Sequence, residues 1–187
     1  MPTYNEKIIK SGNVIEVYKY ENRVQYGFEK TENKYGRICV ASAENKEINR
    51  EKVVNRARTS IRRLVNANVT PRSKFVTLTF KEDIKDLRQA NYEFEKFIKR
   101  LKYKFNLNIK YLTVIEFQDK NRGGVIHYHT IFFNLPYIPN MELSKIWKNG
   151  FIRINRIDNV DNVGAYVCKY MSKDNADVRL QEKKCFF

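Results

Sequence analysis

Long apolar runs are absent from this sequence, and no stretch approaches the length that a membrane-spanning helix needs. The first residues, MPTYNEKIIK, contain no apolar segment followed by small residues, so no secretory signal is expected. Cysteine is scarce: Cys39, Cys168 and Cys185 are odd in number and far apart. This pattern excludes a disulfide framework and a CxxC zinc site, and it favours a reducing cytoplasm. Repeats and linkers rich in proline, glycine or serine are also absent, so 187 residues predict one domain with at most a small appendage.

Positive charge is abundant. The chain has 36 lysines and arginines against 21 aspartates and glutamates, a formal net charge of +15. Such an excess favours a polyanionic partner, because phosphate contacts release counterions. A membrane surface is not expected to be that partner, since no basic amphipathic helix carries a large exposed apolar face. The composition leaves two alternatives, a nucleic-acid-binding protein and a generically basic protein.

The order of predicted elements indicates an α+β protein. Alternating β-branched and aromatic residues predict strands, and a 3.6-residue apolar period predicts helices. Strands are expected within 12–41 (NVIEVYKY, VQYGF, YGRICVA) and at 75–80, 111–118, 125–134 and 151–157; helices are expected at 44–66, 86–105, 143–148 and 163–173. Antiparallel strands with helices on one face predict a ferredoxin-like or palm-like central sheet. Residues 1–70 are expected to form a β-hairpin and a basic helix that pack on a core of residues 71–187.

Finer details of the helices follow from residue type. The basic helix carries an apolar stripe of Val54, Ala57, Ile61 and Leu64. Gly150 is expected to be the left-handed cap that ends the helix at 143–148, and Trp147 is expected in the core. Asp161 or Asn162 is expected to cap the last helix.

Both histidines of the chain lie in one predicted strand, as the triplet His127-Tyr128-His129. Residues two apart in a strand point to the same face, so both imidazoles project together. Two neighbouring imidazoles make half of a metal site. The alternative is a coincidental pair on a solvated strand.

A third ligand is available from the preceding strand. If the two strands form a hairpin that turns about residues 121–122, Glu116 lies opposite His127 on the same face. Two imidazoles and one carboxylate, with positions left open for water and phosphate oxygens, suit Mn²⁺ or Mg²⁺, although the ligand types also admit zinc. Taken alone, Glu116 would be an ordinary surface carboxylate.

The last predicted helix contains Y-x-x-K twice, in the segment YVCKYMSK. Helical spacing places Tyr166, Lys169, Tyr170 and Lys173 on one stripe, while Val163 and Val167 provide an apolar face elsewhere. Two interpretations stand, amphipathic packing and a tyrosine stripe aimed at the metal site. In the second, a phenol oxygen attacks a phosphodiester and leaves a 5′-phosphotyrosyl link, with a lysine stabilising the charge. A second tyrosine would accept a second cleavage.

FVTLTF, then H-Y-H, then Y-x-x-K-Y-x-x-K resembles, in that order, the three motifs of HUH rolling-circle replication initiators. The resemblance covers roughly residues 73–174, and the doubled tyrosine motif is similar to initiators of small phages and their plasmid relatives. It implies an HUH nuclease fold, metal ligation by His127, His129 and Glu116, and nucleophile support from Lys173 and Lys169. It makes Tyr170 the first choice of nucleophile and Tyr166 the second transfer tyrosine. The chain ends soon after this helix, so either it is an isolated nuclease domain or it relies on a host helicase.

The resemblance implies a bacterial cytoplasmic enzyme that nicks single-stranded or hairpin origin DNA and transfers the strand. Residues expected to contact DNA are basic ones on the long helix and a late strand: Arg56, Arg62, Arg153 and Arg156. Two alternatives stay open. One is an HUH single-strand DNA transposase, and the other is a non-catalytic nucleic-acid-binding module in which Tyr128 and Phe132 stack bases.

Overall fold

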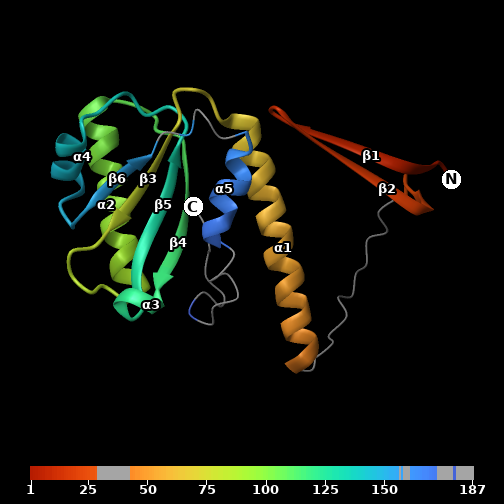
Figure 1. Ribbon diagram of the computed structural model, residues 1–187, viewed down its shortest axis with the longest axis horizontal. Coiled ribbons are helices and arrows are strands. Elements are labelled where there is room, and N and C mark those ends of the chain that lie inside the picture. The colour runs from red at the N-terminus through yellow and green to blue at the C-terminus, as the bar shows by residue number, and fades with distance from the viewer. Residues whose placement is uncertain (29–42, 156, 158–160, 172–178, 180–187) are drawn as a thin grey trace.

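The computed structural model describes residues 1–28, 43–155, 157, 161–171 and 179. Helices and strands alternate along these residues, with a strand pair at the N-terminal end (Figure 1). In chain order the elements are β1 (Thr3–Ser11), β2 (Val14–Gln25), α1 (Ala43–Asn68), β3 (Lys74–Thr79), α2 (Leu87–Phe105), β4 (Tyr111–Gln118), α3 (Asp119–Arg122), β5 (Val125–Phe132), α4 (Asn140–Trp147), β6 (Ile152–Asn155) and α5 (Val163–Met171). No helix of this described part is long and apolar enough to cross a membrane.

The central sheet has the strand order β4-β5-β3-β6, and every neighbouring pair is antiparallel. The hairpin β1–β2 forms a separate two-stranded antiparallel sheet. These sheets and their helices confirm the predicted α+β class. The strands at 75–80, 111–118 and 125–134 are confirmed to within two residues at each end.

Helices cover both faces of the central sheet (Figure 1). The larger core lies between the sheet and the helices α2 and α4, and Trp147 is wholly buried in it as predicted. A smaller core lies on the other face, where Ile61 and Val65 of α1 meet Val163 and Val167 of α5. The prediction of helices on one face is wrong, because every residue of β5 is buried and neither of its sides is left to solvent.

The helix α2 is capped at both ends, by Asp86 at its start and by Asn106 at its end. The carboxylate of Asp86 accepts hydrogen bonds from the backbone N–H groups of Arg88 and Gln89, which have no partner inside the helix. Asn106 adopts the left-handed conformation at the other end, with φ of 47°. The buried stripe between these caps matches the predicted period, so α2 is confirmed as an amphipathic helix.

The N-terminal hairpin differs from the prediction. One long strand, β2, replaces the two expected at NVIEVYKY and VQYGF, and it pairs with β1, which the sequence did not predict. Gly12 occupies the turn with φ of 59°, and a Cβ there would lie 2.1 Å from the carbonyl oxygen of Asn66. The turn therefore packs directly on α1. The segment YGRICVA lies outside the described residues.

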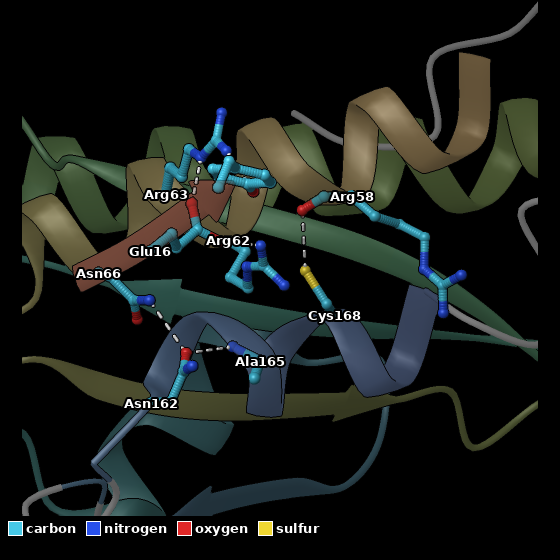
Figure 2. A network of polar contacts seen from close by, with 9 residues as sticks. Glu16, Arg58, Arg62, Arg63, Asn66, Asn162, Ala165 and Cys168 are labelled. Carbon is cyan, nitrogen blue, oxygen red and sulfur yellow. Dashed lines mark hydrogen bonds and ion pairs between the residues drawn. The ribbon is translucent and has the colours of Figure 1, made fainter. Parts of the chain in front are cut away.

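Two side chains anchor this hairpin to α1. Arg62 and Arg63 both contact the carboxylate of Glu16, with 2.6 Å between Nε of Arg63 and Oε2 of Glu16 (Figure 2). Burial raises the pKa of Glu16, but the hydrogen bond from Arg63 and the two guanidinium charges outweigh it, so this pKa lies below 4.5, its ordinary value. Arg63 also donates to the hydroxyl of Tyr18, 2.9 Å away.

Two helix details are corrected. In α1 the buried stripe ends at Val65, and Leu64 is 49% exposed, because Ile61 and Val65, one turn apart, are the residues that pack against α5. The left-handed cap of α4 is Lys148, with φ of 68°, rather than Gly150. Gly150 is required for another reason, since a Cβ there would lie 2.4 Å from the carbonyl oxygen of Thr79.

Candidate functional site

The hairpin β4–β5 brings the predicted ligands together on one face of the sheet. Glu116 pairs with His127, the register expected from the sequence, and Val114 pairs with His129. The one-turn helix α3 and Gly123, with φ of 56°, close the hairpin. Because the pleat alternates, Glu116 and both imidazoles project from the same side.

His129 is held from two sides. Its Nε2 lies 2.6 Å from Oε2 of Glu116. Its Nδ1 lies 3.2 Å from the hydroxyl oxygen of Thr77, the residue of β3 that pairs with His129. A carboxylate accepts hydrogen bonds, so Nε2–H donates to Glu116 and Nδ1 accepts from Thr77. The ring of Phe75 stacks on His129, with 5.9 Å between centroids and 14° between planes.

His127 is buried, and one of its two ring nitrogens lacks a partner in the part of the chain that the structure describes. It is 6% exposed, and its Nε2 has no hydrogen-bond partner among the described residues. Its pKa is lowered to about 4, chiefly by burial and also by electrostatic interaction with His129 and Arg122, while the carboxylate of Glu116 opposes the shift. The imidazole is therefore neutral at pH 7 and presents a buried nitrogen lone pair or N–H on the face that carries Glu116.

Imidazole and carboxylate are side chains that bind divalent cations, so the cluster has the residue types of a metal site. No three His, Cys, Asp or Glu side chains in the described part of the chain surround a common point that could hold a metal ion. Instead, the ligating atoms of Glu116 and His129 contact each other. The orphaned Nε2 of His127 is an atom that a metal ion would satisfy, and two neutral imidazoles with one carboxylate match known divalent sites.

The helix α5 packs on the same face of the sheet, chiefly against β4. Asn162 caps it: its Oδ1 accepts from the N–H of Ala165 at 2.9 Å, as one of the two predicted caps. Asn66 of α1 reinforces this end (Figure 2). Its Nδ2 donates to Oδ1 of Asn162 at 2.9 Å, and its Oδ1 accepts from the buried N–H of Gly164 at 2.7 Å.

One aromatic ring, that of Phe75, lies between Tyr166 and His129. Tyr166 is half-buried, and its ring meets Phe75 edge-on with 5.2 Å between centroids. Since Phe75 stacks on His129 from β5, the three rings form a continuous aromatic chain from α5 to the histidines. The predicted apolar face of α5 is confirmed, because Val163 and Val167 are both buried.

Several predicted residues cannot be placed in this geometry. Residue 170 lies on α5, one turn after Tyr166, but its side chain is outside the described residues, as are Lys173 and Arg156. Lys169 is exposed and does not share the environment of Tyr166. It lines a cleft of about 460 Å³ between α1 and α5, whose other residues are Asn55, Arg58, Thr59, Arg62, Ala165 and Cys168.

The thiol in this cleft has a structural role. Cys168 is buried, and its sulfur donates to the carbonyl oxygen of Arg58 at 3.3 Å (Figure 2). Burial raises its pKa, and the positive charges of Arg58 and Arg62 do not reverse that shift. The thiol is therefore protonated at pH 7.

The basic residues predicted to contact DNA fall into two groups. Arg62 is engaged by Glu16, whereas Arg56 is exposed on α1. Arg153 is exposed on β6, where it pairs with Thr77 and so lies in the same row of the sheet as His129. Among the members of the predicted set that the structure describes, Arg153 shares a sheet row with the candidate ligands.

Thr77 and Phe75 were not predicted as parts of this site. Both lie in the strand FVTLTF, and strand alternation alone would have placed them on one face. The sequence did not indicate which strand pairs with FVTLTF. Thr77 lies beside His129 only because β3 pairs with β5. Tyr128 and Phe132, considered above as base-stacking residues, are wholly buried in the larger core and cannot stack on bases there.

An antiparallel sheet that carries a His–His–Glu cluster, with a tyrosine-bearing helix packed over the same face, defines an α+β protein with a candidate polar centre. The family model "Replication-associated protein ORF2/G2P" matches residues 73–175, which is more than half of the chain. The chain belongs to this family of replication-associated proteins. No curated protein and no solved structure matches it significantly.

Proposed function

We propose that this protein initiates rolling-circle replication by nicking single-stranded origin DNA through a tyrosine, and that it later transfers the strand. The observation that carries the proposal is the position of α5. The helix that contains both tyrosines packs on the sheet face from which Glu116, His127 and His129 project. Membership in a replication-associated family supports the same conclusion at a coarser level.

The direction of α5 favours Tyr170 as the first nucleophile. Figure 1 shows α5 running toward the end of the sheet at which β4 ends and β5 begins, where Glu116 and His127 lie. Tyr166 is separated from His129 by the ring of Phe75. Residue 170 lies four residues, about 6 Å, further along the helix axis in that direction.

A divalent ion, Mn²⁺ or Mg²⁺, is proposed to bind between His127, His129 and Glu116. When bound, it would neutralise charge on the scissile phosphate. Thr77 would support this arrangement by orienting His129, because its hydroxyl lies 3.2 Å from Nδ1 and would accept a hydrogen bond from an Nδ1–H tautomer with Nε2 free to ligate. The neutral state of His127 suits ligation, because only an unprotonated nitrogen binds metal.

The proposed reaction forms one phosphorus–oxygen bond and breaks another. The phenol oxygen of the tyrosine attacks phosphorus, the bond from phosphorus to the 3′ oxygen breaks, and the phenol proton ends on the released 3′-hydroxyl. One phosphodiester is exchanged for another, so the step is reversible without ATP. A second tyrosine at the other Y-x-x-K repeat would allow a second exchange.

The DNA backbone is proposed to follow the basic surface beside α5. Arg58 and Lys169 line the cleft between α1 and α5, and Arg56 is exposed on the same long helix. Phosphates in this cleft would contact guanidinium and ammonium groups, and binding would weaken with added salt. Tyr128 and Phe132 are buried, which argues against the non-catalytic alternative in which they stack bases.

The test is a covalent adduct. The protein is incubated with a random-sequence library of single-stranded DNA and Mn²⁺, denatured, and examined for a protein–DNA species that resists denaturation. We expect an adduct that requires Mn²⁺, that falls most strongly in Tyr170→Phe, and that disappears in the double variant with Tyr166→Phe. Tyr103→Phe, altered on α2 at the opposite face, serves as the matched control.

Each outcome has a distinct meaning. Absence of any adduct with the wild-type protein would overturn the nicking function. An adduct that persists in the double tyrosine variant would overturn the assignment of the nucleophile. An adduct that forms equally well with Glu116→Gln, His127→Ala or in the presence of a chelator would overturn the metal site.

A further inference from the structure

We propose that Phe151 is a base-stacking platform for single-stranded DNA next to the histidines, with Arg153 holding the adjoining phosphate. The proposal deepens the function proposed above and rests on it for the identity of the ligand. It concerns the edge of the sheet formed by β6, on the face that carries the candidate ligands. Phe151 has no part in the metal cluster or in the tyrosine helix.

Sheet register places both residues beside the cluster. Arg153 pairs with Thr77, which in turn pairs with His129. The N–H of Thr79 donates to the carbonyl oxygen of Phe151 at 2.9 Å, and Thr79 pairs with His127. Phe151 and Arg153 therefore extend, at the β6 edge, the two rows of the sheet that contain the histidines.

Side-chain alternation puts the two residues on the ligand face. Ile152, between them, is buried in the larger core on the opposite face. Its neighbours in sequence must point the other way, toward the side from which Thr77 contacts His129. On that side α5 packs chiefly against β4, at the far edge of the sheet.

The backbone around Phe151 is held rigidly although its ring is exposed. Next to the bond from Thr79, the N–H of Lys81 donates to the carbonyl oxygen of Asn149 at 2.8 Å. Gly150 allows this close approach, because a Cβ there would lie 2.5 Å from the nitrogen of Lys81. Phe151 is nevertheless 69% exposed. A closely packed, hydrogen-bonded loop thus holds an apolar side chain exposed to solvent.

The chemistry of a single strand matches this pair. An exposed aromatic ring stacks on any unpaired base, and an arginine beside it binds the phosphate of the same nucleotide. Phe151 directly precedes β6 and Arg153 lies in it, so a spacing of two residues in extended chain sets ring and guanidinium side by side on one face. A net charge of +15 favours the same polyanion. The occupant is therefore a nucleotide that flanks the phosphate at the histidine cluster.

The experiment separates base stacking from phosphate binding. The full-length protein carrying Tyr166→Phe and Tyr170→Phe, without metal, is titrated with a labelled oligothymidylate of about 16 nucleotides and with an abasic strand of equal length. On this background, Phe151→Ala should weaken oligothymidylate binding roughly tenfold and leave abasic binding unchanged. Arg153→Gln should weaken both and lower the salt slope by about one. Tyr103→Ala, at a ring 92% exposed on α2, is the control and should change neither.

A spectroscopic variant provides a second readout. Trp147 is the single tryptophan of the chain and is wholly buried, so Phe151→Trp adds one exposed reporter. Its emission should be quenched by oligothymidylate and unaffected by the abasic strand. Oligothymidylate binding that is unchanged in Phe151→Ala, or the absence of quenching in Phe151→Trp, would overturn the platform.

Failure of the platform and failure of nicking can be told apart. If the wild-type protein forms the Mn²⁺-dependent adduct and Phe151→Ala binds normally, the platform alone is refuted. If no adduct forms but Phe151→Ala weakens oligothymidylate binding, nicking is refuted and the platform stands. If oligothymidylate does not bind to the unaltered face at all, the platform is also refuted.

Discussion

The side chain of Asn66 connects α1 to the start of α5 through hydrogen bonds, and removing it should lower the stability of the fold. It is 6% exposed and makes two hydrogen bonds to α5, one to Asn162 and one from the buried N–H of Gly164. In Asn66→Ala the N–H of Gly164 loses its acceptor, which costs about 1–3 kcal/mol for a buried donor. Loss of the bond to Asn162 adds about 1 kcal/mol. We therefore expect a loss of roughly 2–4 kcal/mol in the free energy of unfolding.

Thermal and urea unfolding measure this loss. For a chain of this size, each kcal/mol lowers Tm by about 2–4 °C, so the decrease should be on the order of 10 °C. Asn68→Ala is the matched control, because Asn68 is exposed on the same helix and its amide donates to the carbonyl oxygen of Leu64 within that helix. Its effect should stay within about 0.5 kcal/mol.

A third variant tests which bond matters. Asn66→Asp keeps an acceptor for Gly164 and places a negative charge at the N-terminus of α5, where the helix dipole favours it. We expect a smaller loss than in the alanine variant. Equal losses in Asn66→Ala and Asn68→Ala would refute the reasoning, because they would show that the buried bond to Gly164 contributes nothing to stability.

Three further variants test neighbouring features. Gly164→Ala should destabilise the fold by about 1–3 kcal/mol in urea unfolding, because its Cβ would lie 2.2 Å from the carbonyl oxygen of Arg62. Glu16→Gln should cost on the order of 1 kcal/mol at pH 7. Because the pKa of Glu16 is lowered, this contribution is complete above pH 4.5 and is lost as the pH falls through the folded-state pKa. The difference in unfolding free energy between Glu16→Gln and the wild type should therefore shrink as the pH is lowered below 4.5. Mn²⁺ at about 100 times its dissociation constant should stabilise the wild type by about 2.7 kcal/mol and leave His127→Ala unchanged in a thermal shift assay.

Controls make these results specific. Ala165→Ser alters an exposed neighbour of Gly164 and should change stability little, so a similar loss there would contradict the packing argument. Glu21→Gln alters an exposed carboxylate on β2 and should leave the acid limb of the stability curve unchanged. A thermal shift by Mn²⁺ that survives in His127→Ala would place the ion elsewhere.

The β4–β5 hairpin was predictable because its signals are local. YLTVIEFQ and the strand with both histidines alternate, and a short polar turn between them admits few registers. Pairing Glu116 with His127 follows once that turn is set. The caps of α2 and α5 were predictable for a similar reason, because Asp86 and Asn162 bond to backbone groups two or three residues away.

Other features depend on contacts distant in sequence. β1 is exposed over most of its length and is rich in charge, so it lacks the apolar alternation that marks a half-buried strand. Leu64 and Val65 are both apolar, and only the position of α5 decides which of them is buried. Thr77 meets His129 across 52 residues of chain, and no local pattern reports such a contact.

The family match begins at residue 73, but the tyrosine helix is held by residues before it. Ile61 and Val65 of α1 complete the core beneath α5, and Asn66 completes its N-terminal cap. Without α1, the side of α5 that carries Cys168 would face water, and Gly164 would lose its acceptor. The sheet presents the candidate ligands without help from α1, since they belong to strands that pair with each other. The orientation of α5 relative to those strands therefore depends on its contacts with α1, which lies outside the part of the chain that the family model covers.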